Sequence, residues 1–355
     1  MANQPALTGI HFKNWRSLRD VTIDNLTPIT VFVGANSSGK TNIFDAFRFL
    51  RDAETDGTIE ANYAWRVREK IRTMGVANEE PVGLTLFLNP NYFDGVVQHL
   101  ERLVFEGNTV FFFGGNSKSE LFQQELNENK KTSEYITRCW QLLSENFMPP
   151  RSIPSESDPG NSYLIEPSAR NVPFMLYVMQ QTKSQIYSEL QKDLRWLLSH
   201  IDKTEVEQDD LEIRLMVRES DHSGEKASTI SAGTSRLIAM LTAYYALDMR
   251  TSDLPGLIVI EEPDTAIHPL LLQKFVELLR GYTEKENPRQ FILTTHNPMF
   301  LNFFKPEEVR IVERDEHGET TVSNVDMDVA KVWLEQDGAY NLGNLWTTRL
   351  LGGVP

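Results

Sequence analysis

Eight consecutive residues constrain the fold of this chain more than any other feature of its sequence. The pattern G-x-x-x-x-G-K-[ST] is matched at every position by Gly34, Ala35, Asn36, Ser37, Ser38, Gly39, Lys40 and Thr41. The apolar, β-branched run Ile29 to Val33 predicts a buried strand before the motif, and Lys40 to Leu50 predicts a helix after it. A strand, a glycine-rich turn and a helix in this order form the setting of a phosphate-binding loop, so we expect an α/β fold.

The residue types of this loop indicate what it binds. Glycines let the backbone curl so that successive N–H groups point at phosphate oxygens, and the helix N-terminus adds a partial positive charge. We expect Lys40 to reach the β and γ phosphates and the Thr41 hydroxyl to bind Mg²⁺. The sequence therefore predicts ATP and Mg²⁺ as cofactors.

Two adjacent acids end a second apolar run, Leu257 to Ile260. Successive residues of a strand point to opposite faces, so the carboxylates of Glu261 and Glu262 cannot do the same work. We expect Glu261 to face Mg²⁺ and Glu262 to orient or deprotonate the attacking water. Read alone, the pair would equally suit two solvated acids at a strand end; the phosphate-binding loop favours the catalytic interpretation.

Two further positions are candidates for nucleotide chemistry. His296 follows the apolar run Phe291 to Thr295, at the carboxyl edge where ligands gather in open α/β sheets. Before another predicted helix, Ser231 offers a hydroxyl and Gly233 a close approach of the backbone, which suits an anion-binding helix start. An ordinary serine N-cap explains that pattern equally well. A second phosphate-binding element is redundant unless it serves the nucleotide of a partner molecule.

Taken together, these motifs resemble the ABC-ATPase heads of the RecF, SMC and OLD-like group. The resemblance rests on the order of the loop, Ile-Ser-Ala-Gly-Thr, Glu-Glu-Pro-Asp-Thr-Ala-Ile-His-Pro and Thr-Thr-His-Asn. Residues Phe12 to Leu18 are also similar to the opening strand of that group, which lies beside the nucleotide base. The matches cover residues 8–50 and 228–300. They imply a P-loop NTPase fold, an ABC-ATPase head with a mixed β-sheet core and a helical insertion, that forms head-to-head dimers.

Roles for individual residues follow from the resemblance. Ser231 and Gly233 would contact the γ phosphate bound to the opposing subunit. Glu262 would be the general base, His296 the switch histidine, and Arg16 of the opening strand a nucleotide-binding residue. The loop Asp264 to His268 would cross the dimer interface.

The sequence departs from the pattern of the group at two places. Glu261 stands where an aspartate is usual and is one methylene longer. No glutamine can be assigned to the Q-loop, for which Gln98 and Gln123 are the candidates.

The pattern of predicted strands and helices along the chain indicates three parts. Residues 1–115 and 211–330 are expected to form the ATPase core, and 116–210 a helical insertion. The insertion contains an apolar stripe that we interpret as core packing of two helices: Leu176, Tyr187, Leu190, Leu194, Leu197 and Leu198. The C-terminal tail, 331–355, is expected to dock a partner through the apolar stretch Trp346 to Leu351.

Composition limits the partners. The formal net charge of −15 means that the surface as a whole repels nucleic acid, so DNA contact requires a local basic patch. Such a cluster lies at helical spacing, although a solvated helix face is the other interpretation: Arg66, Arg68, Lys70 and Arg72. The single cysteine, Cys139, excludes an internal disulfide framework, and no long apolar run or secretory signal is present. A cytoplasmic protein with no membrane partner is expected.

The leading hypothesis is an ATP-driven switch in bacterial antiviral defence. Small relatives of this type resemble the ATPase halves of anti-phage systems, which act with a separate and often Toprim-like nuclease. No Toprim-like region follows the predicted core, so we expect the effector to be another protein. ATP would clamp two heads together and hydrolysis would release them. The alternatives are a DNA-repair or chromosome-maintenance ATPase of RecF/SMC type, and a nucleotide-dependent scaffold with negligible turnover.

Overall fold

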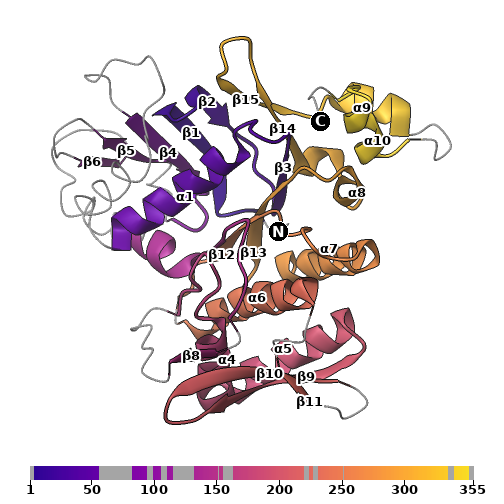
Figure 1. The fold of residues 1–355 in the computed structure, drawn as a ribbon. Helices are drawn as coiled ribbons and strands as arrows, with labels where there is room; N and C mark the ends of the chain where they lie inside the picture. The colour runs from indigo at the N-terminus through magenta and orange to yellow at the C-terminus, as the bar shows by residue number, and fades with distance from the viewer. Residues whose placement is uncertain are drawn as a thin grey trace.

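A mixed β-sheet occupies the middle of this computed structural model (Figure 1). The structure describes residues 4–55, 82–93, 99–104, 110–114, 132–150, 152–154, 163–219, 224–226, 231–250, 252–334 and 340–351. The strand order of the central sheet is β15-β14-β3-β13-β12-β7. Its strands are β3 (Ile29–Val33), β7 (Trp140–Leu143), β12 (Gly256–Glu261), β13 (Arg289–Thr295), β14 (Val309–Arg314) and β15 (Thr320–Asn324). Strand β15 runs antiparallel to β14, and the other neighbours are parallel.

The central strands are buried on both faces. Ile258 and Ile260 of β12 pack into one core, whereas Leu257 and Val259 pack into another. Alternate residues of a strand point to opposite faces, so a parallel strand that is covered on both sides needs a continuous apolar run. This requirement explains why β12 and β13 read as unbroken apolar segments.

One face of the sheet is covered by α1 (Lys40–Thr55), a helix at 132–139 and a second, antiparallel sheet (Figure 1). The strand order of that sheet is β2-β1-β4-β5-β6. Its strands are β1 (Leu7–Trp15), β2 (Leu18–Ile23), β4 (Val82–Leu88), β5 (His99–Val104) and β6 (Val110–Gly114). Aromatic contacts join α1 to the central sheet. The ring centroids of Phe47 in α1 and Trp140 in β7, for example, lie 5.5 Å apart.

Helices cover the other face (Figure 1). They are α4 (Val172–Thr182), α5 (Ser184–Leu197), α6 (Ala232–Ala246) with the 3-10 turn η2 (Leu247–Met249), and α7 (Pro269–Thr283). A small sheet flanks α4 and α5 and contains β8 (Ser152–Pro154), β9 (Ile201–Gln208), β10 (Glu212–Glu219) and β11 (Gly224–Lys226). The C-terminal part adds α8 (Pro298–Leu301), η3 (Pro306–Glu308), α9 (Met327–Leu334) and α10 (Leu342–Thr347).

The structure confirms the α/β class and most of the predicted elements. In particular, the strand, turn and helix around the phosphate-binding loop are β3 and α1, and the predicted apolar stripe of α4 and α5 is largely core. The division into core and insertion stays a prediction. Residues 116–210 are not helical throughout, however, because β7, β8 and β9 lie in this stretch and β7 is a strand of the central sheet.

Much of the apolar surface that predicts a docking site in the C-terminal tail is buried within the chain itself, and the docking role stays a prediction. Leu345 and Trp346 of α10 are buried in the main core, where α10 packs against α8, and Trp346 is only 1% exposed. Gly343 N also donates to Asn302 Oδ1 at 2.9 Å. Leu345, Trp346 and Leu351 therefore stabilise the fold itself, whereas Leu350 is 37% exposed.

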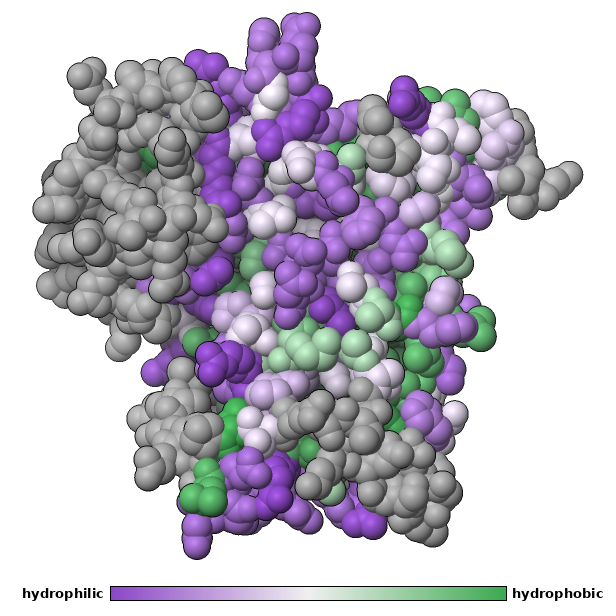
Figure 2. All heavy atoms as spheres, viewed as in Figure 1, coloured by the Kyte–Doolittle hydropathy of each residue, from purple (hydrophilic) through white to green (hydrophobic). Residues whose placement is uncertain are grey.

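The β14–β15 hairpin projects at the top of the view, and hydrophilic residues cover it (Figure 2). Within the described ranges, none of the helices combines the length and the apolar character that crossing a bilayer would require.

Candidate functional site

A cavity of about 420 Å³ lies at the carboxyl ends of the central parallel strands. The loop before α1 forms one wall, and residues that end or follow β7, β12, β13 and β14 form the others. Its volume is in the range of small-ligand sites. It lies where open α/β sheets bind ligands.

The phosphate-binding loop forms a tight turn against this cavity. The Lys40 ammonium lies inside the turn and donates to the carbonyl oxygens of Gly34 at 2.7 Å and Ala35 at 2.9 Å. Gly39 has a φ of +115°, which residues with a side chain rarely adopt. Ser37 also has a positive φ, 67°. Backbone conformations of this kind turn N–H groups inward and form an anion-binding concavity.

The outer side of the loop is held by residues far away in the sequence. Thr320 Oγ1 donates to the Ser38 carbonyl at 2.8 Å, and Thr320 N donates to the Ser17 carbonyl at 2.7 Å. The Thr320 side chain occupies the space where a Cβ of Gly39 would lie. Thr320, the first residue of β15, therefore connects the loop to the turn that precedes β2.

Acidic residues set the electrostatics of the cavity. Burial lowers the pKa of the Lys40 ammonium, and the nearby carboxylates of Glu262, Glu261 and Glu145 oppose that effect. All three acids line the cavity together with Lys40. Such a site suits an anion that arrives with a divalent cation, because the cation offsets the repulsion between the phosphates and the carboxylates.

Glu261 is the buried member of the acid pair. Its side chain receives hydrogen bonds from Glu145 N, at 3.2 Å from Oε2, and from the Thr41 hydroxyl. Burial raises the pKa of Glu261 to about 7, against the smaller opposing effect of these bonds. Thr41 and Glu261 thus place a hydroxyl and a carboxylate together, which are the oxygen ligands that Mg²⁺ prefers. The extra methylene of Glu261 does not prevent this contact, and the two residues fit a magnesium ion.

The raised pKa of Glu261 predicts a pH-dependent penalty in the metal-free protein. The folded-state pKa exceeds the ordinary value of 4.5, because folding buries this carboxyl group and disfavours its charged form. The contribution of Glu261 to the free energy of unfolding is therefore fully present below pH 4.5 and is lost as the pH rises through about 7. Glu261→Gln should therefore stabilise the protein at pH 8, by about 3 kcal/mol at most at 1.36 kcal/mol per pKa unit, and the gain should shrink toward pH 4.5. Thermal denaturation without Mg²⁺ checks this, with the exposed Glu316→Gln as control. A Glu261→Gln protein no more stable than wild type at pH 8 contradicts it.

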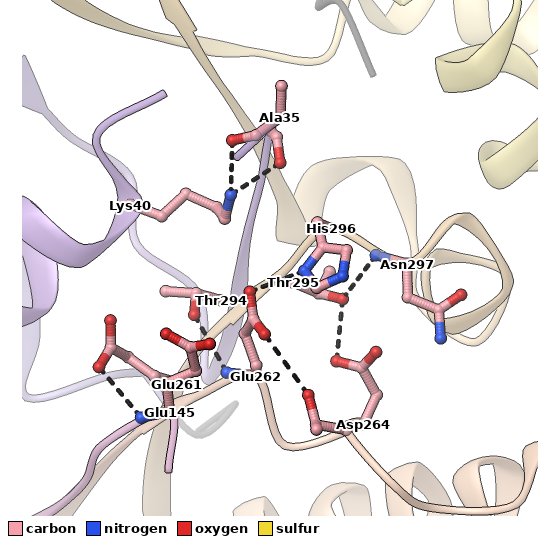
Figure 3. A network of polar contacts seen from close by, with 12 residues as sticks. Ala35, Lys40, Glu145, Glu261, Glu262, Asp264, Thr294, Thr295, His296 and Asn297 are labelled. Atoms are coloured by element: carbon pink, nitrogen blue, oxygen red, sulfur yellow. Dashed lines mark hydrogen bonds and ion pairs between the residues drawn. The ribbon is translucent and has the colours of Figure 1, made fainter. Parts of the chain in front are cut away.

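Glu262 is held beside His296 (Figure 3). The Nδ1 atom of His296 lies 2.7 Å from Glu262 Oε1, and the Thr265 hydroxyl donates to Oε2 at 3.4 Å. Glu262 has a positive φ of 47°, and its N–H donates to the Thr294 carbonyl at 3.1 Å. A carboxylate with an imidazole partner at the cavity wall can accept a proton from a water molecule.

Glu145 is a site residue that sequence reasoning missed. It follows β7, whose residues Trp140 to Leu143 pair in parallel with β12, and its side chain lines the cavity. The only sequence signal was the short apolar run at 140–143. The Q-loop candidates Gln98 and Gln123 lie outside the described residues.

Arg236 of α6 was also missed. It is 3% exposed, and its guanidinium donates to the carbonyl oxygens of Glu145 and Glu262, each at 2.8 Å. The guanidinium also lies over the Phe147 ring, 3.9 Å from its centroid. One buried cation therefore joins the helix that follows Ser231 to the ends of β7 and β12.

Arg16 does not line the cavity. It forms an ion pair with Asp45 of α1 at 2.6 Å and donates to Asn42 Oδ1 at 3.1 Å. Its guanidinium thus connects the β1–β2 turn to the first turns of α1. The basic cluster from Arg66 to Arg72 lies outside the described residues.

Ser231 and Gly233 do not line the cavity of their own chain. Ser231 is the exposed N-cap of α6 and accepts from Thr234 N at 3.1 Å. A Cβ on Gly233 would overlap the Ala266 carbonyl, so this helix start packs against the loop Asp264 to His268. Gly233 is buried, whereas Ser231 and Ala232 are exposed and do not line the cavity of their own chain, so these two residues are accessible to a second molecule.

Comparison with known proteins supports the ATPase interpretation. A family model described as "AAA domain, putative AbiEii toxin, Type IV TA system" matches residues 29–302. The chain is 23% identical to the OLD nuclease of Thermus scotoductus over 358 residues, which cover 90% of this chain and 64% of that protein. It is 22% identical to the Septu protein PtuA of Bacillus mycoides over 371 residues, 97% of this chain and 44% of that protein. The chain thus spans less than two thirds of the length of these relatives.

Further matches concern a short segment and the fold. The DNA replication and repair protein RecF of Heliobacterium modesticaldum is 35% identical over 85 residues, 21% of this chain and 20% of that protein. The SMC head domain from Thermotoga maritima has a TM-score of 0.53 at 14% identity and covers 91% of this chain and 100% of its own. The Smc head from Pyrococcus furiosus, bound to the C-terminal domain of ScpA, has a TM-score of 0.59 at 13% identity, with 94% and 99% covered. These structures confirm the predicted fold of an ABC-type ATPase head.

Proposed function

Because the chain belongs to this AAA domain family and is an ABC-type ATPase head of the RecF, SMC and OLD group, we propose that it hydrolyses Mg-ATP between two copies of itself. One observation carries the proposal. Lys40, the Thr41–Glu261 contact and the Glu262–His296 contact surround a single cavity at the carboxyl edge of the sheet. Cation, metal ligands and base are the three parts that phosphoryl transfer to water requires.

Each residue has one role in this proposal. The loop from Gly34 to Thr41 binds the phosphates through its N–H groups and Lys40. Thr41 and Glu261 would hold Mg²⁺, which when bound supplies charge neutralisation at the phosphate oxygens. Glu262 accepts the proton of the attacking water, and His296 keeps the carboxylate in place.

The second copy of the chain completes the site. Ser231 and Gly233 do not line the cavity of their own chain, and Ser231 is exposed at the helix start, which supports a role on the nucleotide of the partner. Arg236 connects this helix to the backbone of Glu262 and Glu145. Engagement of the helix start by the partner is thereby linked to Glu262, the proposed general base.

A substitution at the helix start tests the dimer. Ser231→Arg should leave Mg-ATP affinity within about twofold, because Ser231 does not line the cavity. It should abolish ATP-dependent dimerisation and lower kcat by about a hundredfold, since oriented contacts to the transferred phosphoryl group are lost. Sedimentation and phosphate release measure both effects, and Ser184→Arg, at the exposed start of α5, is the control. An active Ser231→Arg dimer would refute the arrangement.

The closed dimer is proposed to gate a separate effector, a nuclease, in antiviral defence. The support is the likeness to an OLD nuclease and to the Septu protein PtuA. Coexpression with the product of an adjacent gene tests this, with nucleic acid cleavage measured in ATP, in ADP and without nucleotide. A rate of cleavage that differs between ATP, ADP and no nucleotide supports gating. Stimulation of the ATPase by duplex DNA without a partner would instead favour the repair type, and absence of phosphate release at saturating ATP would favour a scaffold.

A further inference from the structure

An arginine outside the sequence motifs lies at the edge of the phosphate-binding loop. Arg314 ends β14, which pairs with β3, the strand that leads into the loop. Its Nε donates to the Ser37 carbonyl at 2.9 Å, and its Nη1 donates to the Gly318 carbonyl. Two bonds to backbone oxygens therefore fix the guanidinium plane, and its remaining N–H donors make no hydrogen bond to the residues that the structure describes.

Arg314 holds one peptide plane of the phosphate-binding loop in place. The carbonyl of this plane, on Ser37, accepts from Arg314 Nε at 2.9 Å, and its N–H, on Ser38, donates to the Ala35 carbonyl at 3.2 Å. Thr320 does the same for the Ser38 carbonyl. Arg314 also lines the cavity, so it contacts the loop and the ligand space at once.

The cavity contains more acidic side chains than permanently charged basic ones, so a second cation beside Lys40 would help to neutralise bound phosphates. Glu145, Glu261 and Glu262 line it, and the Lys40 ammonium is already bonded to carbonyl oxygens of its own loop. Among the lining residues, Arg314 is the other permanently charged base. Within the described part of the chain, no carboxylate forms an ion pair with it. A guanidinium in this state is suited to bidentate binding of phosphate oxygens.

We propose that Arg314 is a second phosphate-binding residue, which holds the β and γ phosphates of the nucleotide against the loop from the side of the β14–β15 hairpin. The inference rests on the proposed function, because it takes the ligand of the cavity to be ATP. It assigns to the hairpin a direct part in nucleotide binding. The bare sequence around Arg314, Val-Glu-Arg-Asp-Glu-His-Gly, contains no nucleotide motif.

A purely structural arginine would behave differently from a phosphate contact. If Arg314 only supported the loop backbone, its removal would weaken ATP, ADP and AMP equally and would lower the melting temperature. Loss of a phosphate contact lowers the affinity for ATP most, for ADP less and for AMP least. The contribution of such a contact to affinity falls as the salt concentration rises. Lysine keeps the charge but loses the bidentate geometry, so Arg314→Lys should recover part of the affinity.

The experiment is a titration of wild type, Arg314→Gln and Arg314→Lys with the three nucleotides and Mg²⁺ by calorimetry. Arg314→Gln should raise the Kd for ATP about tenfold and that for ADP about threefold, tenfold being 1.4 kcal/mol, with AMP unchanged. Arg19→Gln is the matched control, because Arg19 pairs with Glu319 of the same hairpin at 2.8 Å and does not line the cavity.

The outcomes separate this inference from the proposal on which it rests. Unchanged ATP affinity in Arg314→Gln, or an equal loss for all three nucleotides with a lower melting temperature, overturns the role of Arg314 and leaves the ATP site standing. No binding of ATP to the wild-type protein overturns the proposed function itself. A tenfold loss in Arg19→Gln as well would show that any positive charge near the hairpin suffices, and would also overturn the inference.

Discussion

Replacing Glu262 with glutamine should lower kcat for ATP hydrolysis by about a thousandfold and leave Mg-ATP bound. The carboxylate lies at the cavity wall, with His296 Nδ1 2.7 Å from its Oε1. Glutamine has the same shape, but its amide cannot accept the proton of the attacking water. General base catalysis typically contributes between 10² and 10⁴ in rate. Phosphate release at saturating ATP measures the loss.

The same variant should trap the closed dimer. In the proposed cycle, binding of ATP joins the two heads and hydrolysis separates them. Because this variant blocks hydrolysis, sedimentation should show a dimer that persists in ATP and dissociates in ADP. Glu277→Gln is the control, because this carboxylate of α7 is exposed, accepts from Gln273 at 2.9 Å and does not line the cavity. Turnover within tenfold of wild type in Glu262→Gln would assign the base to another residue.

Replacing Gly39 with alanine should weaken ATP binding by more than about a hundredfold. The φ of +115° is strained for any residue with a Cβ, and the new methyl group would overlap the Thr320 side chain. Thr320 in turn bonds to the Ser38 and Ser17 carbonyls, so the loop cannot make room without losing these contacts. Calorimetric titration with Mg-ATP measures the effect.

A second glycine provides the control for this substitution. A Cβ on Gly281, in α7, would meet nothing within 4 Å, so Gly281→Ala should leave binding unchanged and stabilise the helix by a few tenths of a kcal/mol up to about 1 kcal/mol. Thermal denaturation of both variants separates a damaged loop from a damaged fold. If Gly39→Ala binds ATP within threefold of wild type, the rigid loop described above is not what grips the phosphates.

The sequence predicted the parts of the site whose geometry is local. The loop, the acid pair and His296 each lie at the end of a buried strand, and one short stretch of sequence contains both the strand and the functional residue. Parallel pairing then brings the ends together at one edge, which the order of the elements was sufficient to predict.

The missed residues depend on contacts between distant segments. Glu145 enters the site because β7 pairs with β12, more than a hundred positions away, and Arg236 reaches two carbonyl oxygens that end different strands. Burial was equally hard to read. The apolar residues around Trp346 look the same in sequence whether they pack against α8 or against a partner, and only the fold shows that they pack inside.

The bonds between Thr320 and the phosphate-binding loop also bear on synthesis of the protein. A ribosome makes Ser38 long before it reaches Thr320, 282 positions later. Until β15 has emerged and paired, the outer carbonyls of the loop lack these donors. We therefore expect the loop to reach its final shape only after residue 320 has been made and β15 has paired with β14.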